Sequence, residues 1–251
     1  MKKNNLKSIK KLLVRQYEQF LGNDNYVKFV VVASPRTGSN FLISLLSSHR
    51  NVYAYGELFN KISDKNCRQI WDSTFSKKMP HVRAVGFKIF YDHPLGSEDR
   101  EVWELINKND NIRIIHLVRD NTLRSQLSLL VAYKTNIWGL TPTMHNIPLK
   151  ERKVKVDVEK FIGNLHKIND YKKELGKLYK EHPYYELSYE ALISNVQGEM
   201  DKLFEFLDVP QRKVKSNLRK QNPENISELI ENYEEFRSKI KETEFACFLK
   251  D

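Results

Sequence analysis

Apolar residues occur in four short runs that have the character of buried strands. Residues 27–33, 82–91, 112–118 and 184–188 are rich in Val, Ile, Leu, Phe and Tyr and show little alternation with polar residues. Near-continuous apolar runs of this length are typical of parallel strands, which are covered on both faces. The four runs therefore predict a mainly parallel sheet.

The segments between and after these runs repeat apolar residues at helical spacing. This pattern predicts helices over residues 40–48, 121–132, 157–179, 189–207 and 224–240. Strands that alternate with helices indicate an α/β fold in which helices flank the sheet. The chain has 251 residues and no convincing linker or internal repeat, so we expect one domain over residues 1–251.

Two further segments change this picture. Apolar residues at helical spacing among many lysines predict a helix over about residues 4–21, packed on the domain with a solvated basic face; contact of this helix with a membrane surface is the less favoured alternative. Residues 133–156 fit neither period and contain Trp138, Gly139, His145 and two prolines. We expect a long surface connection there, on the acceptor side of any active site.

Charge and cysteine content narrow the possible partners. Lys and Arg number 42 against 32 Asp and Glu, a formal net charge of +10 that favours anionic partners such as nucleic acid, membrane headgroups, phosphorylated cofactors or acidic sugars. Cys67 and Cys247 are too far apart for a redox or zinc motif. No run reaches the roughly 20 apolar residues of a membrane span, and the N-terminus lacks the apolar core of a signal peptide. We expect a cytoplasmic protein.

The first predicted strand runs directly into the sequence SPRTGSN and then into a helix. At a helix N-terminus, unpaired backbone N–H groups and the positive end of the helix dipole favour an anion. Arg36 adds a planar guanidinium that suits phosphate or sulfate oxygens. The candidate anion-binding residues are Ser34, Pro35, Arg36, Thr37, Gly38, Ser39 and Asn40.

This loop differs from the phosphate loop of ATPases and GTPases. That loop reads G-x-x-x-x-G-K-[ST], with the Lys on the phosphates and a hydroxyl on magnesium. Here Ser39 stands at the Lys position, Asn40 stands at the hydroxyl position, and the leading Gly is absent. A metal-dependent nucleotide kinase with a degenerate loop is therefore only an alternative.

A second candidate site follows the strand predicted over 112–118. Arg119 comes directly after this strand, Asp120 or Asn121 is a suitable N-cap, and Ser128 lies on the helix that follows. Ligands of open α/β sheets bind outside the carboxyl ends of the strands. Arg119, Ser128 and the SPRTGSN loop are thus expected to reach one crevice.

With these motifs the chain resembles the sulfotransferases that use 3′-phosphoadenosine-5′-phosphosulfate (PAPS), particularly the bacterial carbohydrate type related to nodulation-factor and glycolipid sulfotransferases. SPRTGSNFL resembles their 5′-phosphosulfate loop, and VRDNTLRSQLS resembles their 3′-phosphate motif. YGELFN, VGFKIFYDH, YYELSYEALISN and LRKQNPENISELIENYEEF extend the resemblance along the chain. Asp120 stands where relatives often have a second Arg, and residues 133–156 match no family segment.

The resemblance implies a P-loop-like fold and transfer of a sulfuryl group from PAPS to a hydroxyl of a carbohydrate or glycolipid. The product nucleotide is adenosine 3′,5′-bisphosphate, and no metal is implied. Arg119 and Ser128 would hold the 3′-phosphate, with Arg219 and Lys220 as further cations. Arg36 and the loop amides would stabilise the leaving 5′-phosphate.

The resemblance also suggests a general base. Glu57, in the sequence GELF, is the first choice, and a role in a salt bridge is the structural alternative. His93 is the second choice because it follows a strand and has a suitable ordinary pKa. Lys88 lies in mid-strand, where the pattern leaves open whether it faces the crevice or solvent.

Aromatic residues could add a stacking surface to this site. The candidates for stacking on a sugar or on adenine are Tyr53, Tyr55, Phe59, Trp71 and Trp138, although most aromatic residues at apolar spacing belong to a core.

A nucleic-acid-binding protein is an alternative to the enzyme. Such a protein would carry a basic stripe with interleaved aromatic residues. The lysines here are scattered instead, so no nucleic-acid partner is expected. The acceptor and the oligomeric state stay open.

Overall fold

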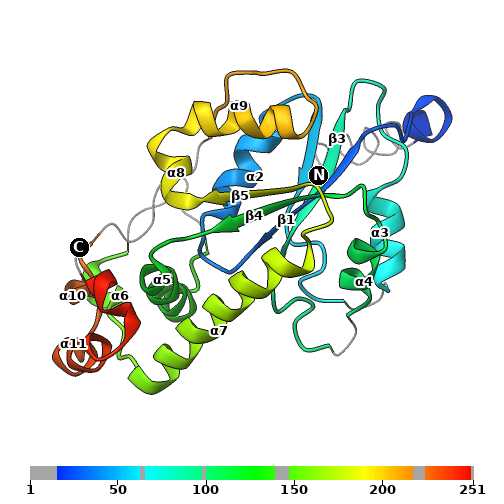
Figure 1. Ribbon diagram of the computed structural model, residues 1–251. Helices are drawn as coiled ribbons and strands as arrows, with labels where there is room; N and C mark the ends of the chain where they lie inside the picture. Colours follow the sequence, from blue (N-terminus) through cyan, green and yellow to red (C-terminus); the bar gives the residue numbers. More distant parts are fainter. Residues whose placement is uncertain (1–15, 63–65, 98–99, 139–146, 217–223, 250–251) are drawn as a thin grey trace, which may run out of the picture.

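The structure is a computed structural model that describes residues 16–62, 66–97, 100–138, 147–216 and 224–249 (Figure 1). Its centre is a five-stranded sheet with the order β2-β3-β1-β4-β5, in which all neighbours are parallel. The strands are β1 (Val27–Ala33), β2 (Val52–Tyr55), β3 (Ala84–Phe90), β4 (Arg113–Val118) and β5 (Tyr184–Ser188). The predicted parallel α/β fold is confirmed.

Helices cover both faces of this sheet (Figure 1). They are α2 (Ser39–Ser47), α3 (Cys67–Thr74), α4 (Glu101–Asn107), α5 (Thr122–Thr135), α6 (Leu149–Arg152), α7 (Val158–Leu178), α8 (Tyr189–Ser194), α9 (Val196–Phe206), α10 (Ile226–Leu229) and α11 (Tyr233–Lys241), followed by the 3-10 helix η1 (Glu244–Leu249). The strands β1 and β5 have the predicted bounds, and β3 and β4 lie within the predicted runs.

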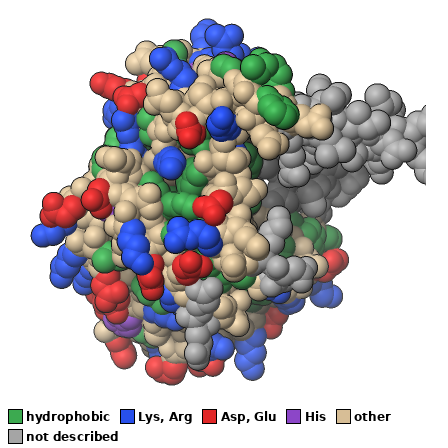
Figure 2. Space-filling model, turned by 90° about the vertical axis from the view of Figure 1, so that its right-hand side faces the viewer, with side chains coloured by type: hydrophobic (Ala, Val, Ile, Leu, Met, Phe, Trp, Pro, Cys, Tyr) green, Lys and Arg blue, Asp and Glu red, His purple; other side chains and the backbone are tan. Residues whose placement is uncertain are grey.

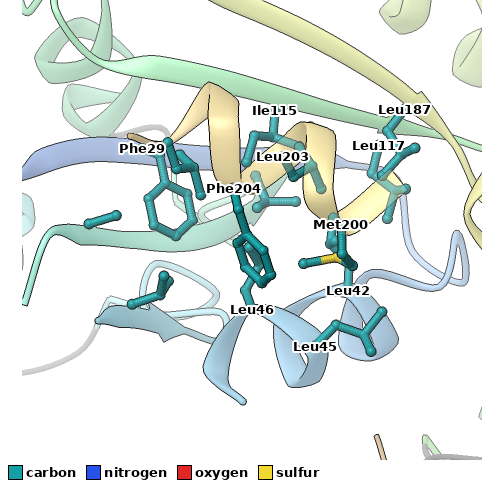
Figure 3. Close-up of a cluster of buried hydrophobic side chains, with 14 of the residues drawn as sticks. Phe29, Leu42, Leu45, Leu46, Ile115, Leu117, Leu187, Met200, Leu203 and Phe204 are labelled. Atoms are coloured by element: carbon teal, nitrogen blue, oxygen red, sulfur yellow. The ribbon is translucent and has the colours of Figure 1, made fainter. Parts of the chain in front are cut away.

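Alternation along β1 builds the two main cores. Phe29 and Val31 point to the face covered by α2, α8 and α9, whereas Val30 and Val32 point to the face covered by α3, α4 and α7. Figure 3 shows the first core, in which Phe204 of α9 lies beside Phe29 and α2. Each fully buried apolar side chain of this size contributes about 1.5–3 kcal/mol. These cores fix where each strand ends.

Some helices differ from the predicted ones for local reasons. The predicted helix over 189–207 is divided at Asn195, whose backbone leaves the helical region at φ −145° and whose side chain accepts a hydrogen bond from the Gly198 N–H at 3.1 Å. The helix predicted over 224–240 is divided into α10 and α11, because Ile230 leaves the helix and forms a bridge with Val154. The sequence pattern missed β2, α3 and α4, which have four, eight and seven residues.

The two unusual segments are partly described. Residues 16–21 are helical, and their apolar side chains face solvent, with Phe20 78% exposed. The segment 133–156 is more regular than predicted, since α5 continues to Thr135 and α6 follows at Leu149–Arg152. Within the described ranges, no helix combines the length and the apolar character that crossing a bilayer requires.

The surface in Figure 2 bears on the nucleic-acid alternative. On this face, Lys and Arg side chains are interspersed with Asp and Glu. A nucleic-acid interface would instead concentrate positive charge in a patch or stripe. The face shown in Figure 2 therefore gives no support to that alternative.

A buried polar network lies between the sheet and α7. His116 of β4 is fully buried, with Nε2 2.6 Å from the Tyr91 hydroxyl and Nδ1 2.5 Å from the Tyr184 hydroxyl. Tyr184 donates to Glu186 Oε2 at 3.2 Å, so it accepts from Nδ1–H, and Tyr91 donates to Nε2. Burial lowers the pKa of His116 to about 4, although Glu186 acts in the opposite direction. The network thus contains a neutral imidazole.

This network predicts acid sensitivity. Between the ordinary pKa near 6.5 and the folded-state pKa of about 4, the unfolded chain binds a proton that the folded chain does not, so stability falls as the pH falls. Relative to pH 7, this proton uptake by the unfolded chain lowers the free energy of unfolding at pH 5 by on the order of 1–2 kcal/mol. We expect His116→Gln to have a lower Tm at pH 7 but a smaller loss of Tm between pH 7 and pH 5. Equal losses in the two proteins would contradict this assignment.

Candidate functional site

The candidate residues from the sequence gather at the carboxyl edge of the sheet. The SPRTGSN loop follows β1, Glu57 follows β2, His93 follows β3 and Arg119 follows β4. Because all five strands are parallel, these ends meet at one edge (Figure 1). This is the edge at which open α/β sheets bind ligands.

The loop after β1 has a strained, internally bonded conformation. The hydroxyl of Thr37 donates to the Ser34 carbonyl at 2.9 Å, and both residues are buried. Arg36 and Gly38 have positive φ values of 64° and 84°, of which only that of Gly38 is free of steric cost. Gly38 is the N-cap of α2 and gives it no side-chain cap, so the first-turn amides face the loop. This geometry suits the anion that the sequence predicts here.

Tyr189 closes one side of this loop. A Cβ atom at Gly38 would lie 2.4 Å from Cδ2 of Tyr189, the first residue of α8. The guanidinium carbon of Arg119 lies 4.8 Å from the centre of the same ring, a cation–π contact. Tyr189 thus packs between the loop and Arg119. The sequence analysis missed it, although it follows β5 as the other site residues follow their strands.

Arg119 is buried and incompletely bonded. Its side chain is 13% exposed, its Nη1 donates to the Arg36 carbonyl at 3.0 Å, and its Nε lies 3.8 Å from Glu190 Oε1. Nε is buried and has no hydrogen-bond partner in the structure. Burial lowers the pKa of Arg119, while Tyr189 and Glu190 act in the opposite direction. Buried donors of this kind normally have an acceptor, so the site suits an added anion.

Arg36 brings the loop and the second motif together. Its Nε donates to Ser128 Oγ at 3.1 Å, and its Nη1 donates to the Trp138 carbonyl at 2.8 Å. Burial lowers the pKa of Arg36, and the charge of Arg119 lowers it further. Two guanidinium groups that are desolvated and repel each other favour a multiply charged anion near both. Arg36, Arg119 and Ser128 therefore lie in contact with one another at this edge, as their places after β1 and β4 predicted.

Lys88 lies on the other side of the loop. It is opposite Val31 in the sheet register and therefore points to the α2 face. Its amine is 2% exposed, lies 2.8 Å from Glu57 Oε1, donates to Ser39 Oγ at 3.3 Å and also donates to Asn40 Oδ1. Burial lowers the pKa of Lys88, and Glu57 partly offsets this. The open question of its orientation is answered: Lys88 faces the loop.

Glu57 and His93 complete this second group. The Glu57 side chain is 28% exposed, and its Oε2 lies 3.4 Å from Asn60 Nδ2 and 4.0 Å from His93 Nε2. The backbone N–H of Phe90 donates to His93 Nδ1 at 3.4 Å, so a neutral His93 carries its proton on Nε2, toward Glu57. Burial lowers the pKa of His93, which favours this neutral form. The salt bridge expected as the structural alternative for Glu57 is present, with Lys88 as its partner.

The remaining candidate residues for the site differ in how deeply they are buried and in whether the structure describes them. Phe59 and Trp71 are core residues, Tyr53 and Tyr55 pack against the same core, and Trp138 is 44% exposed. Arg219 and Lys220 lie outside the described residues. Among the residues that the structure describes, no three His, Cys, Asp or Glu side chains are grouped as a metal site.

An open cleft of about 760 Å³ lies at the opposite, amino edge of the sheet. Its lining includes Lys28, Arg83 and Asp110, together with Arg113, which forms an ion pair with Asp208. None of the candidate residues lines this cleft. The candidate site at the carboxyl edge is thus distinguished from this cleft by its cations and its loop rather than by cavity size.

Comparisons with known proteins give the relatives of this chain. A family model described as "Sulfotransferase domain" matches residues 27–248. Nodulation protein H of Rhizobium tropici is 23% identical over 241 residues, covering 88% of this chain and 92% of that protein. Nodulation protein H of Rhizobium meliloti (strain 1021) is 31% identical over 127 residues, covering 44% and 49%. The crystal structure of a sulfotransferase from Alicyclobacillus acidocaldarius has the same fold, with a TM-score of 0.50, 14% identity and coverage of 89% and 94%.

The contact between Gly38 and Tyr189 gives a stability test of the site. We expect Gly38→Ala to lower the free energy of unfolding by about 1–3 kcal/mol, because the new methyl group meets the Tyr189 ring and the backbone has a positive φ. The matched control is Gly163→Ala, at an exposed helical position with no atom within 4 Å of the new Cβ. That change should be neutral or stabilising. Urea unfolding measures both, and similar values for the two would refute the packing argument.

Proposed function

Because the chain belongs to the sulfotransferase domain family, we propose that it transfers a sulfuryl group from PAPS to a hydroxyl of a carbohydrate or glycolipid. The proposal that PAPS is the donor rests on two buried guanidinium groups, those of Arg36 and Arg119, beside the loop after β1. A nucleotide with a phosphate at each end of its ribose offers charge to both. The product of this reaction is adenosine 3′,5′-bisphosphate.

The residues at this edge suit both ends of the nucleotide. Arg119, with its unpartnered buried Nε, and the Ser128 hydroxyl hold the 3′-phosphate in this proposal. The amides and hydroxyls of residues 34–40 hold the 5′ end. Arg36 lies between the two groups, since its backbone is in the loop and its side chain contacts Ser128. Arg219 and Lys220 remain proposed as further cations.

The amine of Lys88 supports a sulfotransferase rather than a nucleotide kinase. In an ATPase loop, a Lys and a hydroxyl of the first helical turn bind the phosphates and magnesium. Here Ser39 and Asn40 occupy those positions, and both bind the Lys88 amine instead. The positive charge at the start of α2 thus comes from β3, and Asn40 is used as an acceptor for this amine.

Glu57 is proposed as the general base. Its carboxylate is partly exposed and can accept the proton of an acceptor hydroxyl, while Lys88 fixes one of its oxygens at 2.8 Å. His93 Nε2 lies 4.0 Å from the other oxygen, beyond hydrogen-bond distance, and His93 remains the second candidate for the base. PAPS supplies the sulfuryl group and a stable leaving phosphate. Lys88 and Arg36 carry the positive charge that stabilises negative charge developing near the loop.

The proposal of a carbohydrate or glycolipid acceptor rests on the similarity of this chain to bacterial relatives. The match to Nodulation protein H of Rhizobium tropici extends over most of both chains, although the identity is 23%. The motifs of this chain resemble those of the bacterial carbohydrate type. A sugar hydroxyl is therefore the proposed acceptor group.

Arg119→Ala tests the nucleotide site. We expect adenosine 3′,5′-bisphosphate, without magnesium, to raise the Tm of the unchanged protein by mass action. Loss of a charged hydrogen-bonding group should weaken its affinity about 10- to 100-fold in Arg119→Ala. Arg83→Ala is the control, because Arg83 is an exposed arginine at the opposite edge of the sheet. Equal affinities in the two variants, measured by calorimetry, would remove Arg119 from the nucleotide site.

Glu57→Gln separates catalysis from binding. The amide keeps the shape of the side chain but cannot accept the acceptor proton, so turnover should fall by about 10² to 10⁴ while affinity for the bisphosphate stays unchanged. Glu104→Gln, at an exposed position on α4, is the control. Sulfate transfer from radiolabelled PAPS measures the rate. If Glu57→Gln retained full activity, the base would have to be sought at His93 and tested with His93→Gln.

A further inference from the structure

We propose that Tyr133 and Trp138, here called the aromatic pair, form the platform on which a sugar ring of the acceptor stacks. The proposal rests on the proposed function and names the part of the chain that recognises the acceptor. Tyr133 lies in the last turns of α5, and Trp138 follows the end of that helix. Their ring centres are 5.1 Å apart, and their planes are nearly perpendicular at 89°.

The aromatic pair is exposed where most aromatic residues are not. Tyr133 is 66% exposed and Trp138 is 44% exposed, whereas Phe59, Trp71, Phe87 and Phe204 are buried in the cores. Two neighbouring exposed aromatic rings cost solvation free energy, and such patches commonly mark binding surfaces. Neither ring is held there by a core contact in the three buried clusters.

The aromatic pair is attached to the phosphate site. Arg36 Nη1 donates to the Trp138 carbonyl at 2.8 Å, and the same guanidinium donates to Ser128 through Nε. Ser128 and Tyr133 lie five residues apart on α5, a rise of about 7.5 Å with their side chains about 140° apart around the helix. The contact between Arg36 and the Trp138 carbonyl therefore places the platform next to the proposed donor site, beyond Ser128 along α5.

The chemistry of the pair suits a sugar. An aromatic face packs well against the C–H face of a pyranose ring, and the edges of that ring keep their hydroxyls free for reaction and for water. Trp138 Nε1 donates to Asn136 Oδ1 at 3.3 Å, so the indole N–H already has an acceptor, and 44% of the residue is exposed. Adenine is the less suitable occupant, because the nucleotide charges are held by groups at the strand ends, while the pair lies beyond Ser128 along α5.

The test uses the full chain and three oligosaccharide probes: cellotetraose, N-acetylchitotetraose and maltotetraose. Saturation-transfer NMR titrations measure their binding with and without adenosine 3′,5′-bisphosphate. We expect at least one probe to bind at millimolar concentration, with sugar C–H protons receiving the signal. Trp138→Ala and Tyr133→Ala should each weaken that binding about tenfold. Phe20→Ala, which removes an exposed aromatic ring from residues 16–21, is the matched control and should leave it unchanged.

Two results would overturn the platform. One is that no probe binds, or that a probe binds equally to the unchanged protein and to Trp138→Ala. The other is that Trp138→Ala and Tyr133→Ala weaken the bisphosphate rather than the sugar, which would assign the pair to adenine. The bisphosphate thermal shift of the same samples reports on the donor independently. Absence of sugar binding to the unchanged protein together with an intact thermal shift refutes the platform alone, and absence of that shift in the unchanged protein refutes the donor.

Discussion

The concentration of buried positive charge at one edge of the sheet is the constraint on which the site depends. Arg36, Arg119 and Lys88 are each desolvated, and burial lowers the pKa of all three. Holding such charges out of water costs free energy, which the two sheet cores offset by fixing the strand ends. Carboxylates contact two members of this group, through Glu57 on Lys88 and Glu190 near Arg119. Three buried cations close together suit a multiply charged anion such as a nucleotide with two phosphates.

The sequence pattern predicted the strands and helices in which apolar residues occur in long runs or at regular spacing. The strands β1 and β5 have the predicted bounds because a polar loop follows β1, whereas β5 starts after Pro183 and ends at Ser188, the N-cap of α8. The four residues of β2 are too few for a periodicity, and the break at Asn195 depends on its own side chain, which caps α9. Local side-chain hydrogen bonds of this kind override a continuous apolar pattern.

The candidate site was predictable to the extent that it follows from strand direction. Arg119 and the loop after β1 could be brought together from the sequence because parallel strands end at one edge. The orientation of Lys88 could not, since it requires the register of β3 against β1. The role of Tyr189 depends on the space left by Gly38, a contact between residues 151 positions apart that no local pattern encodes.

In the proposed enzyme, the donor side and the acceptor side are built from different kinds of structure. The donor side consists of strand ends and helix starts, whose positions are fixed by the sheet, so that a family can retain them while the rest of the sequence changes. The acceptor side, as proposed, begins where α5 ends and the regular structure stops at Asn136, in a left-handed conformation. Irregular segments tolerate changes in length and sequence that strands do not. Arg36 joins the two sides, because one guanidinium contacts both Ser128 and Trp138. In this proposal, a change of acceptor alters the segment beyond Asn136, while Arg36 and Arg119, which would hold the donor, stay at the ends of β1 and β4.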